Sequence, residues 1–410
     1  MRKWLHRIAV FFAILGPGFI TANADNDAGG IATYAITGAQ EGYSLLWVLL
    51  LITFSLGIVQ EMSSRMGIVT GQGLAGLIRE KFGVRWTLMA MLLLFFANIF
   101  VTIADFSGIA ASMEIFGVPR VISIPVFMIF ILWLLIQGTY RFVEKVFLFS
   151  SLFFFTYVIS GFMAKPEFHK IAMGFVPSFK TNTEYLVLVI ALIGTTITPW
   201  MQFYLQSSIV EKRIKLTHLK YSSAEVYIGA FFTDFVSFFI IIATAATLFK
   251  AGIRIDTAEK AAQALRPLVG TYCSLLFAIG LLNASVLAAA ILPVSTSYAI
   301  CEAFGWESGI NKKIKDAPMF FSILAFTAIV GGGIVLFPQL NLMKVMLISQ
   351  TANGILMPFI LIFMLRIIND KNIMGKYTNS FTRNVISYLT AAGLITLTVF
   401  LLIFSIKDLF

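Results

Sequence analysis

Charged residues are scarce in this chain. Only 12% of its 410 residues are Asp, Glu, Lys or Arg, and 59% are hydrophobic, whereas a typical soluble domain carries about 25% charged residues. Long apolar runs recur along the whole length, and most reach the roughly 20 residues that cross about 30 Å of hydrocarbon as a helix. The composition excludes a soluble globular protein and predicts an all-α membrane protein, with residues 1–410 as a single transmembrane domain.

Cysteine and histidine are rarer still. Cys273 and Cys301 lie in or beside one apolar run, so neither a disulfide nor a cysteine metal cluster is expected. His6, His169 and His218 fall in loops or near chain ends. Because no cluster of these residues lies within the apolar runs, we expect neither an enzyme nor a bound cofactor.

The apolar runs give the predicted topology. They predict eleven transmembrane helices, at residues 8–37, 43–67, 86–112, 117–138, 145–164, 184–209, 222–249, 270–303, 318–337, 341–368 and 384–408. With a cytoplasmic N-terminus, 20 of the 30 Lys and Arg residues fall on the cytoplasmic side, as the positive-inside rule requires. The prediction is a multi-pass cell-membrane protein with an extracellular C-terminus.

Three connections and the net charge complete this outline. The glycine-rich segment 63–85 is predicted to be the longest cytoplasmic loop, and the outer segments 165–183 and 250–268 are predicted to be surface helices. The net charge of +10 comes from basic residues spread over short loops rather than gathered in one patch. The expected partner is therefore the lipid bilayer and not a nucleic acid.

The first predicted span is interrupted near its middle. Asp25 and Asp27 lie inside it, where an ionisable residue is costly and marks function. Gly29 and Gly30 follow, and paired glycines let the backbone unwind. Unwound carbonyls must line a cavity or bind something, and with a carboxylate they form an oxygen site for a cation. The alternative is that the aspartate only caps the second half-helix.

The sixth span carries a comparable interruption. Pro199 removes a backbone donor and moves Thr198 out of the helical region, which leaves carbonyls near Thr195 unpaired. The side chains of Thr195, Thr198 and Gln202 add neutral oxygens. The alternative is a packed kink whose threonines bond back to their own helix.

The two breaks occur five spans apart, at the start of each half of the chain. Transporters built from inverted five-helix repeats place discontinuous helices at equivalent positions and bind substrate between them. We therefore predict one repeat over about 8–164, a second over about 184–368, and an extra helix over about 384–408.

The residues around the breaks resemble the NRAMP family of divalent metal transporters. The resemblance is carried by Gly16–Ile20, Asp27–Thr33, Gly38–Ala39, Gly42–Tyr43, Leu45–Trp47, Gln60–Met62, Arg65, Gly67, Thr70–Gly71, Tyr204–Leu205, Ser207, Ser349–Gln350 and Met357–Phe359. It implies a LeuT-type fold with broken helices 1 and 6. It also implies a metal ligand at Asp27 and a position at Gln350 that can approach the ion.

Several positions depart from that family's pattern. Gly30 replaces an asparagine ligand and Thr198 replaces a methionine whose sulfur favours transition metals, which leaves a wider, harder oxygen site of the kind that suits Mg²⁺. A shifted alignment would restore a sulfur through Met201. Trp200 replaces a histidine and Gly108 an acidic residue.

A proton route needs a series of titratable groups through the membrane. The ninth span lacks the family's arginine, and Asp105 and Asp27 are the groups that remain of its proton route. These departures resemble the NRAMP-related magnesium transporters.

The sequence therefore predicts a divalent cation transporter that favours Mg²⁺, also carries Mn²⁺ and works without proton coupling, functioning as a monomer. The predicted metal residues are Asp25, Asp27, Gly30, Thr195, Thr198, Gln202 and Gln350. The alternatives are proton-coupled Mn²⁺ or Fe²⁺ uptake and an amino-acid transporter on the same fold. Paired acids at Asp25 and Asp27 argue against the second, because an amino-acid site binds a carboxylate.

Overall fold

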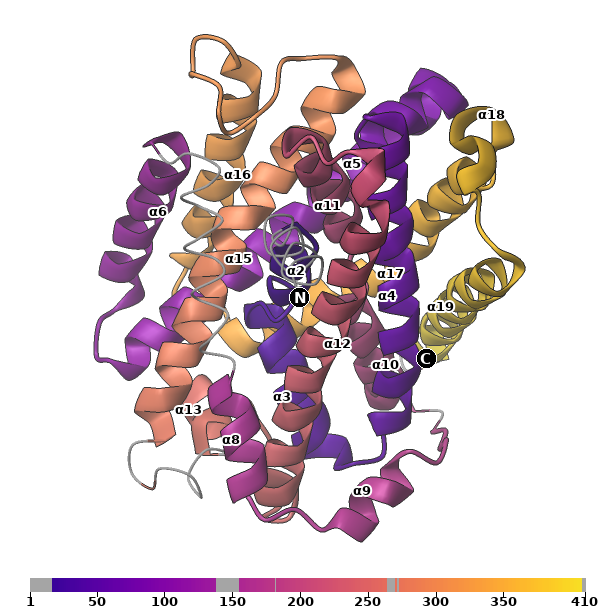
Figure 1. Ribbon diagram of the computed structural model, residues 1–410. Coiled ribbons are helices and arrows are strands. Elements are labelled where there is room, and N and C mark those ends of the chain that lie inside the picture. The colour runs from indigo at the N-terminus through magenta and orange to yellow at the C-terminus, as the bar shows by residue number, and fades with distance from the viewer. Residues whose placement is uncertain (1–16, 138–154, 181, 264–269, 271–272, 408–410) are drawn as a thin grey trace, which may run out of the picture.

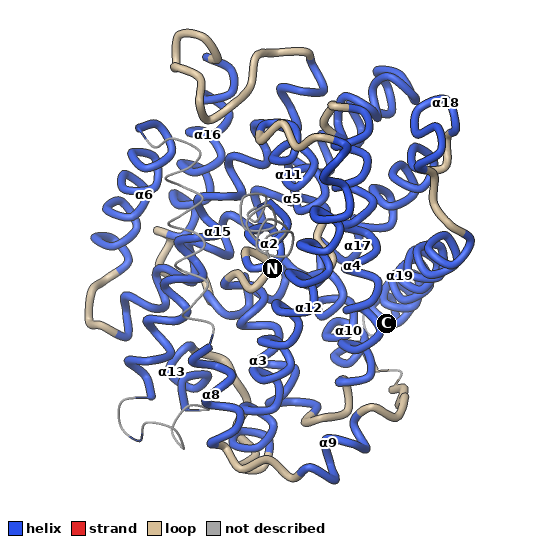
Figure 2. The backbone as a smooth tube through the Cα atoms, in the orientation of Figure 1, coloured by secondary structure: helices blue, strands red, loops and turns tan. Residues whose placement is uncertain are grey.

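Helices form all of the regular secondary structure in the part of the chain that the computed structural model describes, namely residues 17–137, 155–180, 182–263, 270 and 273–407 (Figure 2). The long helices are α4 (Leu46–Thr70), α5 (Leu74–Ile115), α6 (Arg120–Gln137), α12 (Leu219–Thr244), α15 (Cys273–Phe304), α16 (Pro318–Val335), α17 (Leu342–Ile368) and α19 (Phe381–Lys407). The shorter helices are α2 (Pro17–Asn23), α3 (Ala28–Glu41), α8 (Phe155–Met163), α9 (Phe168–Gly174), α10 (Thr183–Thr196), α11 (Pro199–Glu211), α13 (Ala258–Ala262) and α18 (Lys371–Met374). Short 3-10 or π turns lie at Leu216–His218, Ala245–Phe249 and Gly375–Tyr377.

The predicted spans match the helices closely. Among the described residues, nine helical stretches are long and apolar enough to cross a bilayer, and each coincides with a predicted span. The first predicted span appears as the pair α2 and α3, and the fifth is represented by α8. Residues 8–16, 145–154 and 271–272 of the predicted spans lie outside the described residues. The count of eleven therefore stays a prediction, whereas the all-helical membrane fold with two broken helices is confirmed.

The prediction of a long loop over 63–85 is wrong. Helix α4 continues to Thr70 and α5 begins at Leu74, so the connection is only three residues long. Two of the glycines lie instead at a helix end and at a kink within a helix. Gly71 ends α4 in the left-handed conformation, and Gly83, with φ +80°, kinks α5 where a surface stretch turns into the bundle. The predicted surface helix in 165–183 is present as α9, which is largely exposed. The segment 250–268 contains α13, but its alanines are buried in the main core, so it is not a surface helix.

The arrangement of the bundle places the two breaks at its centre. Figure 1 shows α6 and α19 at opposite edges, α9 and α13 at one end and α18 at the other. Helix α2 lies about midway between these ends, and α3 continues toward the end that carries α9. The interruption of the first helix is thus far from both ends of the bundle.

Small residues let the central helices approach closely. A side chain on Gly194 of α10 would collide with the backbone of Gln350 and Gly354 on α17, so these two helices touch backbone to backbone. This contact brings Gln350 over the break between α2 and α3.

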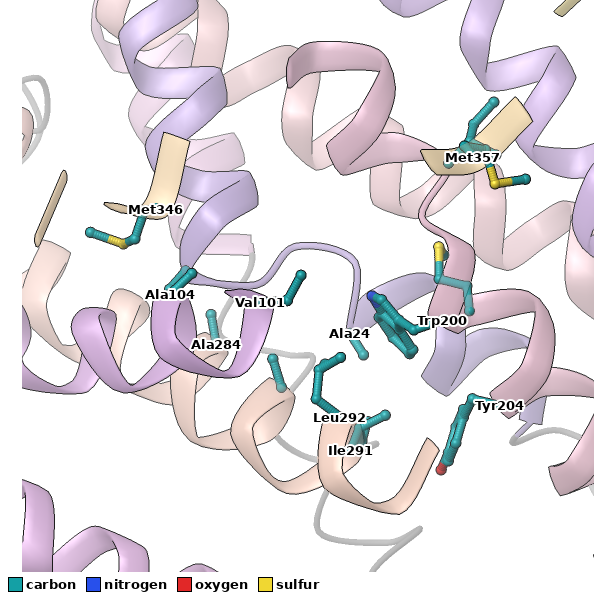
Figure 3. Packing of buried hydrophobic residues seen from close by; sticks show 14 of the residues in the cluster. Ala24, Val101, Ala104, Trp200, Tyr204, Ala284, Ile291, Leu292, Met346 and Met357 are labelled. Carbon is teal, nitrogen blue, oxygen red and sulfur yellow. The ribbon is translucent and has the colours of Figure 1, made fainter. Parts of the chain in front are cut away.

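Apolar side chains surround this region. Figure 3 shows Ala24, Trp200 and Leu292 gathered beside the first break, and Val101 and Ala104 of α5 facing Ala284 of α15. The broken segments are therefore enclosed in the main core and not at the lipid surface.

Candidate functional site

The break in the first helix spans residues 24–27, and Asp27 is the N-cap residue of α3. Its backbone is extended (φ −71°, ψ −176°), and its carboxylate accepts a hydrogen bond from the backbone N–H of Gly30. The capping role that the sequence offered as an alternative is thus present. This one hydrogen bond does not use the full acceptor capacity of the carboxylate, because its two oxygens together accept about four hydrogen bonds.

Gln350 of α17 holds the same carboxylate from the other side. Its Nε2 donates to Asp27 Oδ1 and Oδ2, both at 3.1 Å, and its Oε1 accepts from Asn353 Nδ2 at 2.9 Å. Asn353 therefore orients the Gln350 amide so that its nitrogen faces Asp27. Gln350 thus lies beside Asp27 and donates to its carboxylate, and its approach to an ion stays a prediction.

Three oxygens converge beside Gly30. A methyl group built on Gly30 would lie 2.7 Å from the carbonyl oxygen of Asp25, 3.1 Å from Thr195 Oγ1 and 3.2 Å from Asp27 Oδ1. Thr195 Oγ1 is buried and, within the described residues, makes no hydrogen bond. A carboxylate, a backbone carbonyl and a hydroxyl thus face one small space that exists because residue 30 has no side chain.

The sixth-helix break supplies one side of this space. Helix α10 ends at Thr196, Ile197 leaves the helical region (φ −122°, ψ 78°), and α11 starts at Pro199. Thr196 donates to its own helix at Leu192 O (2.9 Å) and binds Tyr34 OH at 3.0 Å, which ties the two breaks together. The two interruptions predicted from sequence therefore meet in space.

The remaining predicted site residues of the sixth helix fall into two groups, one with an unpartnered oxygen and one that faces α4. Thr198 Oγ1 is buried and has no hydrogen-bond partner in the described chain, so it keeps its oxygen for a ligand. The Gln202 side chain instead faces α4, where Oε1 accepts from Ser63 at 3.1 Å. Met201 also faces α4, with Sδ 3.9 Å from Gln60 Nε2. Neither the Gln202 oxygen nor the Met201 sulfur is therefore free for an ion beside Gly30.

Asp25 contributes to the space through its backbone, not through its side chain. Its carboxylate is 1% exposed, and neither oxygen has a hydrogen-bond partner among the described residues. The next residue, Asn26, is bonded to Thr233 of α12, the chain neighbour of Asp234. From the sequence, Asp25 and Asp27 were predicted to act as one acidic pair. In the structure, their side chains point toward different helices.

Asn26 explains this separation. Its Nδ2 donates to Thr233 O at 3.2 Å and to Thr233 Oγ1 at 2.8 Å, and its Oδ1 accepts from Ser237 at 2.9 Å. All of these partners lie on α12, so Asn26 fixes the unwound segment against that helix. No sequence pattern identifies this anchor, since an asparagine between two aspartates looks equally suited to a ligand role.

The acidic residues of the site have no cysteine or histidine beside them. Across the described residues, no three His, Cys, Asp or Glu side chains are placed to hold a metal together. Asp105 of α5 is buried and acts electrostatically on Asp27. Gly108 cannot carry a larger residue, because a side chain there would collide with Ser285 and Ala28. A cation here would be bound by one carboxylate and neutral oxygens.

Comparison with known proteins extends this description. The family model "Nramp: Natural resistance-associated macrophage protein-like" matches residues 18–404. The divalent metal cation transporter MntH of Staphylococcus saprophyticus is 30% identical over 428 residues, which cover 97% of this chain and 93% of that protein.

Solved structures share the fold. A manganese transporter of Eremococcus coleocola, in complex with an aromatic bis-isothiourea substituted compound, superposes with a TM-score of 0.76 at 22% identity, over 96% of this chain and 86% of that one. MhsT in complex with L-phenylalanine superposes with a TM-score of 0.64 at 14% identity, over 94% of this chain and 98% of that one.

Proposed function

This chain belongs to the Nramp family, and on that premise we propose that it is a transporter that carries divalent metal cations across the membrane, Mn²⁺ and Mg²⁺ among them. The family membership supports transport, and the relative of S. saprophyticus is named a divalent metal cation transporter. The convergence of Asp27, the Asp25 carbonyl and Thr195 beside Gly30 is the observation that carries the proposal to particular residues.

Asp27 supplies the charge in this proposal. Its Oδ1 faces the space beside Gly30, while Gln350 and the Gly30 N–H hold the carboxylate in place. The Asp25 carbonyl and the Thr195 hydroxyl are neutral oxygen ligands from the two broken helices. Thr198 lies at the start of α11 and binds the ion directly or through a water, since its oxygen has no partner in the described residues.

The oxygen donors support the admission of Mg²⁺. Oxygen ligands suit Mg²⁺, Ca²⁺ and Mn²⁺, whereas sulfur ligands select softer ions. The Met201 sulfur faces Gln60 on α4, so sulfur does not contribute to the site that we propose. Mg²⁺ gives up its waters reluctantly, and a site without a side chain at residue 30 leaves room for some of them.

We further propose that transport is not coupled to protons. Gly108 stands where the family has an acidic residue, and its surroundings leave no room for one. Trp200 stands where the family has a histidine, and it is fully buried. With a cytoplasmic N-terminus, an inside-negative potential of 100 mV would favour inward movement of a divalent ion by about 4.6 kcal/mol, twice the value for one charge. That driving force suffices without protons.

The amino-acid alternative is disfavoured by the cap of α3. A transporter of this fold would bind the carboxylate of an amino acid at the N-terminus of a half-helix. Here Asp27 already occupies that position and accepts the Gly30 N–H. A second carboxylate would meet like charge at the same place.

Uptake into proteoliposomes tests the proposal. Purified protein is reconstituted with Mn²⁺ or Mg²⁺ outside, and metal uptake and internal pH are recorded together. We expect saturable uptake of both ions with no internal acidification, and loss of both in Asp27→Asn. The matched control is Asp256→Asn, the same chemical change at a carboxylate whose side chain is 58% exposed and paired with Lys260.

Each part of the proposal has its own contrary outcome. Full uptake by Asp27→Asn would show that Asp27 is not the central ligand. Mn²⁺ uptake without Mg²⁺ uptake would restrict the site to transition metals, and acidification that follows metal entry would establish proton coupling.

A further inference from the structure

Two buried carboxylates lie where the break of the first helix is bonded to α12, because Asn26, next to Asp25, donates to Thr233, next to Asp234. Asp25 lies in the break of the first helix and Asp234 lies near the middle of α12, and they are 1% and 3% exposed. Two like charges placed here would repel each other. Among the described residues, none of their four carboxylate oxygens has a hydrogen-bond partner.

The donors nearest to this pair are committed elsewhere. Thr53 of α4 lies against Asp234, but its hydroxyl donates to Leu49 O at 2.8 Å. The Asn26 amide next to Asp25 donates to Thr233. The polar groups around the pair therefore offer it oxygens rather than protons.

Tyr34 follows the same pattern. Its ring lies near both carboxylates, and its hydroxyl is 3.0 Å from Thr196 Oγ1, whose own proton goes to Leu192 O. Tyr34 therefore donates to Thr196 and keeps a lone pair.

Within the described helices around the pair, no basic residue is placed to neutralise it. Helices α2, α3 and α10 contain none. The basic residue of α4, Arg65, is paired with Glu61, and that of α12, Lys220, lies 14 residues from Asp234, which is roughly 21 Å along a helix. Two like charges without donors or counter-charge are unfavourable in a buried site unless protons or a ligand neutralise them.

We propose that Asp25 and Asp234 form a second divalent-cation site, next to the site at Asp27 and distinct from it. A divalent ion matches the formal charge of the two carboxylates, whereas a monovalent ion would leave one of them uncompensated. Oxygens of Tyr34 and Thr53 are available to complete the ligand set. This inference deepens the proposed function and rests on it.

Asp25 links the two sites. Its backbone carbonyl faces the space at Gly30, and its carboxylate faces α12. A cation in one site repels a cation in the other and so weakens its binding. Ions pass through a membrane protein faster when they bind at several adjacent sites that each release them readily. The second site would therefore speed release of the ion held by Asp27.

Equilibrium binding of Mn²⁺ to the purified full-length protein tests this inference. We expect two Mn²⁺ per chain in the wild type and one in Asp234→Asn. Asp25→Asn keeps the backbone carbonyl and should also bind one. Glu225→Gln is the matched control, a buried carboxylate on the same helix that accepts from Gly18 N at 3.1 Å, and it should bind two. The melting temperature of each variant shows whether it is folded. If Asp234→Asn does not fold, the Mn²⁺ count of Asp25→Asn decides whether the second site exists.

The outcomes separate this inference from the proposed function. One Mn²⁺ in the wild type, or two in both folded Asp→Asn variants, overturns the second site. In either case Mn²⁺ uptake that depends on Asp27 leaves the proposed function intact. Uptake that survives Asp27→Asn overturns the proposed function instead.

Discussion

Replacing Gly30 by alanine should impair cation transport and leave the fold intact. Residue 30 lies in the first turn of α3, where a methyl group would project among the Asp25 carbonyl, Thr195 Oγ1 and Asp27 Oδ1. The methyl is the smallest side chain that enters this space, and it brings no charge or hydrogen-bonding group. The change therefore tests whether the space itself binds the ion.

The magnitude follows from the contacts. The methyl would lie 2.7 Å from the Asp25 carbonyl, well under the 3.4 Å of an ordinary contact. Overpacking of this kind costs about 1–3 kcal/mol, while alanine in a helix gains up to about 1 kcal/mol over glycine. Overall stability should therefore fall by no more than about 3 kcal/mol. If the crowding acts on the bound state, ion affinity falls roughly 5- to 140-fold.

The assay compares the Mn²⁺ concentration for half-maximal uptake with the melting temperature of the purified protein. Gly333→Ala in α16 is the matched control, because nothing lies within 4 Å of the added methyl. It should transport normally and melt at the same or a higher temperature. A Gly30→Ala protein with wild-type apparent affinity would refute the placement of the ion beside Gly30.

Three further predictions concern neighbouring contacts. Gln350→Leu removes the donor to Asp27, so the metal-free protein should lose about 1–3 kcal/mol and Mn²⁺ should raise its melting temperature more than that of the wild type; an equal rise in both would contradict this. Arg65→Met breaks a buried pair and two bonds to backbone carbonyls, and thermal unfolding should show a loss of about 3–5 kcal/mol, whereas a loss below about 1 kcal/mol would show that water solvates the pair. Lys81 holds the pKa of Asp370 below its usual range, so this pair stabilises the fold above about pH 4 and loses its effect as the pH falls through the lowered value. The melting difference between wild type and Asp370→Asn should shrink on acidification, and a constant difference would exclude this linkage.

The spans were predictable because membrane helices are selected by local composition. Among the described residues, each of the nine helical stretches that can cross a bilayer coincides with an apolar run. The first break was marked by acidic residues and paired glycines, and the second by glycine, threonines and Pro199. The region 63–85 was wrongly assigned to a loop because its glycines, at Gly71 and Gly83, limit helices rather than prevent them.

The site was predictable only in part. Asp27, Gly30 and Thr195 were identified and do meet. Gln202 was selected for its position one turn after Pro199, but sequence spacing does not say which neighbouring helix a side chain faces, and it faces Ser63. Asp234 carried no distinguishing signal, because a single acid in a span fits a helix contact as well as a ligand.

The sequence by itself determined that this chain crosses the membrane as helices, that two of those helices are interrupted, and that a carboxylate lies at the first interruption, because these features depend on residues close together in the chain. The tertiary structure decided which oxygens share one space. Asn26 binds α12 and Gln350 of α17 binds Asp27, contacts between residues more than 200 positions apart. These contacts turn Asp25 and Asp27 toward different partners, since helix packing sets the direction of a side chain and the local sequence does not.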